Sequence, residues 1–393
     1  MKKCVTDFDL NFKTVILRCD FNVPLKDGII IDDTRIVKSL KTINYILEHK
    51  AKLVILSHLG KVKTYDDKDN NSLRFVYKRL EELLPGKIDF VPLTRDEKIV
   101  TKVNELAFGR AILLENTRFE DLNGKKESNC DMGLSKFWAS LGDIFINDAF
   151  GTLHRAHASN LGISDYLESG IGFLVKDELM ALDELDNPKR DYAVIMGGAK
   201  VSDKIKVIDS LIKKVDKLFI GGAMAFTFLK SQGIDVGKSL VQDDYLDYCY
   251  NLLDKYKDKI ILPIDFYGGN EFNNDSKREL FYITDIPSDF IGMDIGRQTI
   301  DMFIDELKGV ATVFWNGPLG VYEFSNYQDG SKRVLEFIAS NVDKTIIGGG
   351  DMVSCLKKLG FLEQVTYAST GGGAALEYLV DKNLPGLKNI KDE

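Results

Sequence analysis

Basic and polar side chains follow four apolar runs in the first half of the chain, where buried strands would end. The runs cover residues 14–18, 53–57, 111–114 and 144–147. The polar residues near their ends are Asp20, Asn22, Arg35, His58, Lys61, Asn116, Arg118, His154, Arg155 and His157. Arginine binds phosphate or carboxylate through two parallel hydrogen bonds. Any one of these residues could be a helix cap or a surface charge. Their recurrence after four strands nevertheless predicts a site for a small anion that carries both a phosphate and a carboxylate.

Glycine clusters interrupt the second half of the chain, at residues 197–198, 221–222, 268–269, 348–350 and 371–373. Glycine tolerates positive φ angles and lets the backbone approach a ligand closely. We expect four of these turns to open helices, whose free N–H groups would face an anion. A single pair could be an ordinary tight turn, but two triple-glycine turns favour phosphate binding. Lys200 and Lys204 would add positive charge there, and Asp351 offers the hard oxygen that Mg²⁺ prefers.

Short apolar runs separated by helical patterns must position these residues. The second half has further runs at residues 193–196, 218–220, 260–264, 312–315, 345–347 and 365–368, and a helical pattern at 202–215. Runs of this kind are typical of buried parallel strands in βαβ units. Ligands of such sheets bind beyond the carboxyl ends of the strands. The fold class is therefore α/β, with two doubly wound parallel-sheet (Rossmann-like) lobes joined by a helix hinge.

The two lobes are expected to cover residues 1–170 and 189–379, because 393 residues suit two domains better than one. Between them, residues 171–188 predict a connecting helix. Phe173, Leu174, Leu179, Leu182 and Leu185 form its apolar stripe, glycines precede it, and Pro188 ends it.

Bulk properties exclude several classes of protein. A net charge of −8 argues against nucleic-acid binding, which needs a basic face. Five scattered cysteines without a CxxC pair indicate a reduced chain. The first residues do not resemble a signal peptide, and no run approaches the roughly 20 apolar residues of a membrane span. We expect a cytoplasmic protein with no nucleic-acid or membrane partner.

Two rival functions lack their expected features. A nicotinamide dehydrogenase would need a GxGxxG motif followed by an acidic residue, and the chain contains no GxGxxG. A two-lobed binding protein would normally be exported, and it would not explain Asp351 beside a triple-glycine turn. Residues 233–239 (GIDVGKS) approach a P-loop, but with three residues between the glycines instead of four. The pair His154 and His157 lacks a third ligand for zinc.

Motifs along nearly the whole chain resemble those of the phosphoglycerate kinase family. They are RCDFNVP (18–24), DDTRI (32–36), SHLG (57–60), LLENTRF (113–119), INDAFGTLHRAHAS (146–159), MGGAKVSDKI (196–205), GGAMAFTFL (221–229), WNGPLGVYE (315–323), IGGGDM (347–352), STGGGAALE (369–377) and LPGL (384–387). Their number and order make the resemblance specific.

The resemblance implies an enzyme with two substrate sites, one on each lobe. The residues for 3-phosphoglycerate or 1,3-bisphosphoglycerate would be Asp20, Phe21, Asn22, Arg35, His58, Leu59, Gly60, Lys61, Arg118 and Arg155. Those for ATP or ADP would be Gly198, Lys200, Lys204, Gly222, Gly292, Asn316, Pro318, Glu323, Gly348, Gly349, Gly350, Asp351 and Met352. Asp351 would hold the Mg²⁺ of the nucleotide. The tail, residues 380–393, would pack back on the first lobe, and the enzyme would be a monomer.

The implied reaction transfers a phosphoryl group between ATP and the carboxylate of 3-phosphoglycerate. A carboxylate with a pKa of roughly 3.5 is already ionised at pH 7, so the reaction needs no general base. Catalysis would rest on positioning and charge stabilisation after the lobes close. The catalytic residues would be Arg35, Lys200, Lys204, Gly349 and Gly372.

The sequence departs from the family's usual residues in places. Lys61 and Val62 stand where Arg-Pro is typical, so a point charge would replace a bidentate contact. Met352 replaces a usual Ser or Thr, which removes a hydroxyl but keeps the backbone N–H. Ala223, Arg297 and Ala375 replace a typical Gly, Pro and Ser. These changes are expected to affect affinity rather than abolish activity.

Overall fold

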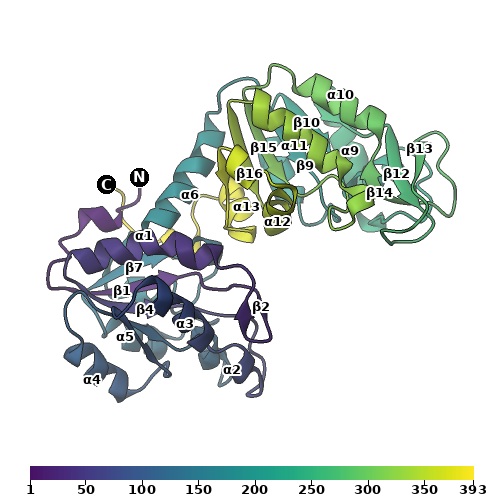
Figure 1. The fold of residues 1–393 in the computed structure, drawn as a ribbon. Helices are drawn as coiled ribbons and strands as arrows, with labels where there is room; N and C mark the ends of the chain where they lie inside the picture. Colours follow the sequence, from purple (N-terminus) through teal and green to yellow (C-terminus); the bar gives the residue numbers. More distant parts are fainter. The chain divides into compact units, whose positions relative to one another are not determined.

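Two compact units make up the chain, which a computed structural model describes over all 393 residues. Unit 1 comprises Met1–Met180 and Asp381–Glu393, and unit 2 comprises Ala181–Val380. Figure 1 labels their helices and strands. The boundary falls within helix α6 (Phe173–Asp183), which a short 3₁₀ turn, Glu184–Asp186, continues. No helix of the structure combines the length and the apolar character that crossing a bilayer requires.

A six-stranded parallel sheet forms the centre of unit 1, in the order β5-β6-β4-β1-β7-β8. Its strands are β1 (Thr14–Cys19), β4 (Lys52–Leu56), β5 (Ile88–Val91), β6 (Ala111–Leu114), β7 (Ile144–Asp148) and β8 (Glu168–Ile171). The helices are α1 (Thr34–Glu48), α2 (Asp67–Asn70), α3 (Arg74–Leu83), α4 (Glu97–Glu105) and α5 (Met132–Ala139). A two-stranded ribbon, β2 (Leu25–Lys26) and β3 (Ile29–Ile30), precedes α1.

Apolar faces of the helices hold this sheet in place. Ile99 and Val103 of α4 and Trp138 of α5 belong to one buried cluster with Ile16 and Val54 of the central strands. Burying a large apolar side chain stabilises the fold by about 1.5–3 kcal/mol. The carboxyl ends of β1, β4, β6 and β7 are thereby fixed side by side.

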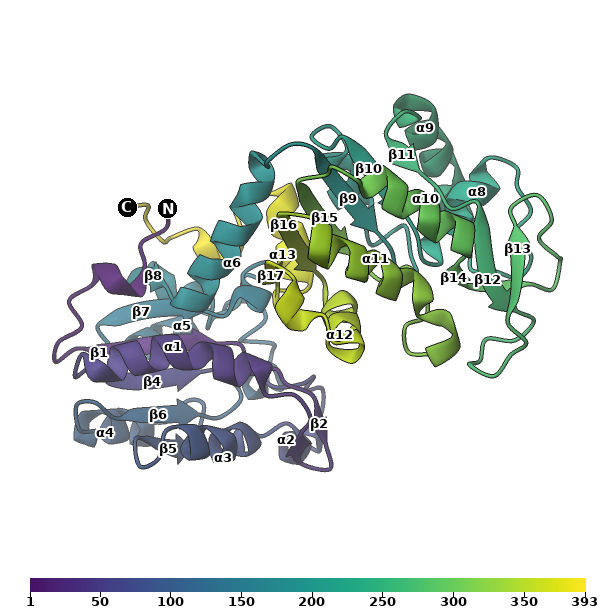
Figure 2. The same cartoon turned by 45° about the horizontal axis from the view of Figure 1, so that its top comes forward.

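The C-terminal tail packs on unit 1. Gly386 donates a backbone hydrogen bond to the carbonyl of Leu153 (2.8 Å), and Lys3 donates one to the carbonyl of Lys391 (2.8 Å). Ile390 is buried at 1% exposure. The two termini lie close together in Figure 1 and Figure 2. The tail therefore secures the segment that immediately precedes His154 and Arg155.

Unit 2 contains a second parallel sheet, in the order β11-β10-β9-β15-β16-β17. Its strands are β9 (Tyr192–Met196), β10 (Lys217–Ile220), β11 (Ile260–Ile261), β15 (Thr312–Asn316), β16 (Lys344–Gly348) and β17 (Tyr367–Ala368). The helices are α7 (Ile205–Leu211), α8 (Met224–Ser231), α9 (Leu246–Tyr256), α10 (Arg297–Leu307), α11 (Asp329–Asn341), α12 (Gly350–Leu359) and α13 (Gly373–Val380).

A small antiparallel sheet, absent from the sequence-based expectation, is also part of unit 2. Its order is β13 (Glu279–Tyr282), β12 (Asp265–Gly269), β14 (Ile291–Ile295). In Figure 1 and Figure 2 it lies at the end of unit 2 opposite β16. The expectation that Gly268-Gly269 forms a turn was wrong, because both glycines lie inside β12. A Cβ on Gly268 would meet the carbonyl oxygen of Ile291 at 2.1 Å, so close strand packing explains the glycine there.

Several expected elements are shorter than the apolar pattern suggested. The strand expected at 260–264 covers only Ile260–Ile261, and the one at 365–368 covers only Tyr367–Ala368. The helix expected at 202–215 covers Ile205–Leu211, because turns occupy the residues after Gly197-Gly198. Only three of the five glycine clusters lead into a helix within two residues: those before α8, α12 and α13.

Candidate active site

Asp20, Asn22 and Arg35 form a connected group at the carboxyl end of β1. A carboxylate oxygen of Asp20 lies 3.1 Å from Nη1 of Arg35, in the first turn of α1. The same Nη1 donates to the backbone carbonyl of Asn22 (2.9 Å), and the Asn22 side chain accepts from the N–H of Gly60 (2.8 Å). One strand end, one helix start and the loop after β4 are thus held together around a half-exposed guanidinium.

His58 lies beside this group and is held by Arg18, which is fully buried in β1. Nη2 of Arg18 is 3.2 Å from Nδ1 of His58. Burial lowers the pKa of His58 well below its usual value, and the positive charges of Arg18, Arg118 and Arg35 lower it further. The ring is therefore neutral at pH 7 and contributes a hydrogen bond rather than a charge.

His157 is also neutral, and a buried carboxylate lies near it. Burial is the largest cause that lowers the pKa of His157 to about 3, followed by the charges of Arg118 and Arg18. Its Nδ1 lies 3.9 Å from Oε1 of Glu127, which is fully buried. Burial raises the pKa of Glu127, and the charge of Arg18 opposes that effect.

The remaining expected anion ligands of unit 1 differ in exposure. Arg118 is half-buried, and its Nη1 donates to Ser128 Oγ (3.0 Å) and lies 3.3 Å from Asp121. Arg155 and Lys61 are exposed. The side chains of Phe21 and Leu59 are buried at 0% and 1%, so only their backbone groups can reach a ligand.

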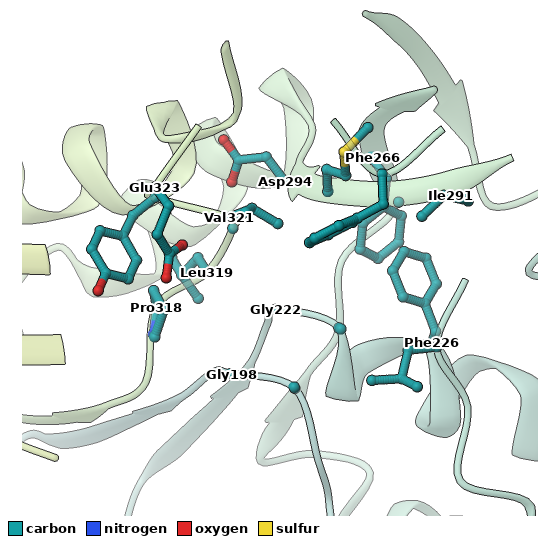
Figure 3. A pocket seen from close by; sticks show the side chains of 18 of the residues that line it. Gly198, Gly222, Phe226, Phe266, Ile291, Asp294, Pro318, Leu319, Val321 and Glu323 are labelled. Carbon is teal, nitrogen blue, oxygen red and sulfur yellow. The ribbon is translucent and has the colours of Figure 1, made fainter. Parts of the chain in front are cut away.

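A cavity of about 290 Å³ in unit 2 brings together many of the expected nucleotide residues. They are Gly198, Gly222, Gly292, Pro318, Glu323 and Asp351. Apolar side chains, among them Phe226, Phe266, Leu319 and Val321, supply most of the wall. Figure 3 shows the two phenylalanines facing Pro318 and Glu323 across the cavity. A largely apolar slot with a few polar groups suits a flat, partly polar ligand.

Glycine is required at two points of this wall, because a Cβ would overlap a neighbouring backbone at one point and a buried ring at the other. Gly222 has φ = +62°, and a Cβ on it would lie 2.5 Å from the nitrogen of Gly198. A Cβ on Gly292 would lie 2.0 Å from the ring of Phe226, which packs against Phe266 at 4.4 Å between ring centroids. A side chain at either position would displace part of the cavity wall.

Asp294 is a buried carboxyl in the same wall. Its oxygens accept backbone hydrogen bonds from Ile295 and Gly330, each at 2.9 Å. Burial nevertheless raises the pKa of Asp294 to about 8. No pattern in the sequence distinguished it from other strand residues.

Lys204 and Asn316 form a second polar group in unit 2. Nζ of Lys204 contacts Oδ1 of Asn316, and burial lowers the pKa of Lys204 while the charges of Asp203 and Asp351 oppose the shift. The amide nitrogen of Asn316 is buried without a partner. It lies 2.6 Å from where a Cβ of Gly349 would be, so it faces the turn that opens α12.

Other expected nucleotide residues lie outside the cavity. Lys200 and Gly350 are exposed, Gly348 is buried in β16, and Gly372, with φ = +54°, precedes α13. Met352, in the first turn of α12, is fully buried, and its side chain does not line the cavity. Asp351, one residue earlier, is exposed and lines the cavity.

Sequence reasoning missed two sets of residues around these sites. Arg18, Glu127 and Ser159 build the buried network behind His58, and only the charge of Arg18 within an apolar strand hinted at it. Phe226 and Phe266 line the cavity of unit 2, and each is 1% exposed.

Comparison with known proteins gives one consistent result. The family model described as phosphoglycerate kinase matches residues 5–382. The phosphoglycerate kinases of Listeria innocua and Fusobacterium nucleatum are each 52% identical to this chain, over 100% of both chains. The solved structure of phosphoglycerate kinase from Coxiella burnetii has a TM-score of 0.88 and 35% identity, over 99% of this chain and 98% of that one. The structure from Pyrococcus horikoshii has a TM-score of 0.84 and 30% identity, with the same coverage. These matches confirm the expected fold class of two parallel α/β sheets, and the chain belongs to the phosphoglycerate kinase family.

Proposed function

We propose that unit 1 binds 3-phosphoglycerate or 1,3-bisphosphoglycerate and that unit 2 binds ATP or ADP, for the reaction of the phosphoglycerate kinase family. In that reaction a phosphoryl group passes reversibly between ATP and the carboxylate of 3-phosphoglycerate. The contrast between the sites of the two units supports this proposal. One is a cluster of arginines and neutral histidines at a sheet edge, and the other is an apolar slot beside glycine turns.

The acid ligand of unit 1 would be held by its phosphate and its carboxylate. Arg118, Arg155 and Lys61 offer positive charge that could reach a phosphate. Arg35, at the start of α1, donates to the carbonyl of Asn22, which follows β1, so both would bind near the reacting carboxylate. Asp20 would accept the hydroxyl of the acid while it orients Arg35.

The nucleotide of unit 2 would place its base in the slot between Phe226 and Pro318. Glu323 offers acceptors for the hydroxyls of a ribose, because its exposed carboxylate lines the slot. The phosphates would then reach the turn Gly348–Gly350, where the first N–H groups of α12 are available. Asn316 supports this assignment, because its amide nitrogen has no partner and faces that turn.

The residues present fit a magnesium ion carried by the nucleotide. No group of three or more His, Cys, Asp or Glu side chains is arranged to hold a metal ion. Mg²⁺ bound to nucleotide phosphates keeps several waters and needs only one or two protein carboxylates. Asp351, in the first turn of α12 and on the wall of the slot, would provide that carboxylate. When bound, the ion would neutralise part of the phosphate charge.

Catalysis would consist of positioning and charge stabilisation. The carboxylate of the acid, with a pKa of roughly 3.5, needs no base to remove a proton. We assign Arg35 and Lys204 to the transferring group, with Lys200 and the N–H groups of Gly349 and Gly372 in support. Loss of one such donor typically lowers the rate by on the order of 10²–10³.

Transfer requires that both substrates meet, although their sites belong to different units. We infer that the units close around the substrates, with α6 as the connecting element, because the unit boundary falls inside that helix. Closure would also keep water away from the transferring group.

We also infer a monomer in the cytoplasm. All five cysteines are free thiols, which suits a reducing compartment. Each site is built within a single unit, so neither needs a second copy of the chain.

A coupled assay of ADP formation tests the proposed function. ADP should form from ATP only when 3-phosphoglycerate and Mg²⁺ are both present. ADP formation at the same rate without the acid would contradict the proposal.

A further inference from the structure

Arg18 carries its charge inside the sheet of unit 1. It lies on β1 and is 0% exposed, so its guanidinium depends on partners inside the protein. Its Nε donates to Oγ of Ser159 (2.9 Å), and its Nη1 donates to the carbonyl of Cys19. Its Nη2 is 3.2 Å from Nδ1 of His58. One buried guanidinium thus connects a strand end, the Ser159 segment and a histidine of the acid site.

The contact with Arg18 determines which nitrogen of His58 carries the proton. A guanidinium donates hydrogen bonds and accepts none. Nδ1 of His58 must therefore be the acceptor, and the neutral ring keeps its hydrogen on Nε2. Nε2 has no hydrogen-bond partner within unit 1, whereas Nδ1 is occupied. The ring is 8% exposed, so Nε2–H is the one polar group that it can offer to a ligand.

Glu127 is linked to Arg18 through Ser159. The carboxylate is 0% exposed, and Oε2 accepts the backbone N–H of Ser159 (2.9 Å) while Oε1 accepts its hydroxyl. Since Oγ of Ser159 accepts from Arg18, its own hydrogen is directed to Glu127. The negative charge of Glu127 therefore balances the positive charge of Arg18 across one hydroxyl.

We propose that Glu127 is a positioning residue of the acid site: through Ser159 and Arg18 it holds His58 as the Nε2–H tautomer, so that the ring presents a donor to the anionic substrate. This inference rests on the proposed assignment of the acid site to unit 1. A ring with the hydrogen on Nδ1 would present a lone pair to an anion and would repel it. The chain Glu127–Ser159–Arg18–His58 therefore converts a buried negative charge into a donor at the site.

Nuclear magnetic resonance of the imidazole nitrogens in the full-length enzyme tests the tautomer directly. In the unmodified protein at pH 7, Nε2 of His58 should show the shift of a protonated nitrogen, and Nδ1 that of an unprotonated one. The opposite assignment would overturn the proposal without any variant.

Two variants test the role of Glu127. Glu127→Gln removes the charge and one of the two acceptors, and Ser159→Ala removes the hydroxyl but keeps the charge. Both should give a mixture of His58 tautomers and raise the KM for 3-phosphoglycerate about tenfold, the effect of losing one hydrogen bond to a charged group. The KM for ATP should stay unchanged.

Asp265→Asn in unit 2 is the matched control. Asp265 is also a fully buried carboxylate, and it accepts a backbone N–H (2.8 Å) and the hydroxyl (2.5 Å) of Thr299. This variant should lose stability but keep the His58 tautomer and the KM for 3-phosphoglycerate. If Ser159→Ala and Glu127→Gln kept a single Nε2–H tautomer and the original KM, Glu127 would have a structural role only.

The design separates this inference from the proposed function. If the unmodified enzyme turned over no 3-phosphoglycerate, the proposed function would fail whatever the tautomer. If turnover were normal and the tautomer did not respond to the Glu127 variant, only the inference would fail.

Discussion

The carboxylate of Asp20 lies 3.1 Å from the guanidinium of Arg35. The pair joins the end of β1 to the first turn of α1, and Asp20 is only 8% exposed. Arg35 is therefore held by its neighbours before an anion arrives. Preorganisation of this kind reduces the loss of side-chain freedom when a ligand binds.

Arg35→Ala should lower kcat by about 10²–10³, because a donor to the transferring group is lost. Steady-state kinetics with 3-phosphoglycerate and ATP measures the effect. Arg110→Ala is the control: Arg110 immediately precedes β6, at the amino end of that strand, and its side chain pairs with Asp89 (3.0 Å). This variant should leave kcat unchanged. If kcat fell equally in the two variants, Arg35 would have no specific role in the reaction.

Gly222→Ala should raise the KM for ATP on the order of tenfold, because the new Cβ displaces Gly198 and with it the wall of the slot. Gly233→Ala is a matched control. Gly233 also has a positive φ (+83°), but a Cβ there would meet nothing within 4 Å. Both variants should lose about 1–2 kcal/mol of stability in thermal unfolding from the positive φ, and Gly222→Ala should lose about 1–3 kcal/mol more because its Cβ overlaps Gly198. If the KM for ATP rose equally in both, backbone strain would explain the effect and close packing would not.

Asp351→Asn should raise the Mg²⁺ concentration needed for half-maximal activity about tenfold, because one charged partner is lost. The measurement is the initial rate against total Mg²⁺ at fixed ATP. Asp305→Asn, which alters an exposed pair with Lys308, should leave the curve unchanged. A curve for Asp351→Asn that matched the parent would rule out a metal contact by this carboxylate.

Asp148 should make the stability of unit 1 depend on pH. Burial raises its pKa from 3.8 to about 6. The folded state thus binds the proton more tightly than the unfolded one, so stability is lost as pH rises from about 4 through about 6. Between pH 4 and pH 7, Asp148→Asn should gain about 2 kcal/mol in unfolding free energy relative to the parent, because part of the effect of the pKa difference is already present at pH 4.

Chemical denaturation at the two pH values gives this difference for Asp148→Asn. Asp143→Asn is the control, because its carboxylate is exposed and bonds the N–H of Thr14 (2.8 Å). A stability difference between Asp148→Asn and the parent that did not change with pH would show that Asp148 keeps its ordinary pKa in the folded state.

The sequence predicted the parallel strands well because their apolar runs are continuous. Residues 111–114 were expected as a strand, and β6 covers the same residues. β5, with the sequence IDFV, and β8, with ESGI, were missed because each interrupts its apolar residues with polar or small ones. The antiparallel sheet was missed for a related reason, since the glycines of β12 look like a turn.

The predicted site residues depended on motif order rather than on contacts. Arg35 and Asp20 were expected at one site, and the structure brings them together. The partners of Arg18 are distant in sequence, because His58 and Ser159 follow it by 40 and 141 residues. Local patterns cannot show that such residues meet.

Calorimetric titration of both ligands into three proteins tests most directly whether the two sites lie in separate units. Arg35→Ala should lose affinity for 3-phosphoglycerate and keep its affinity for ATP, and Gly222→Ala should show the reverse. The unmodified chain should bind both ligands. Loss of ATP affinity in Arg35→Ala equal to its loss of acid affinity would contradict the assignment of the acid site to unit 1.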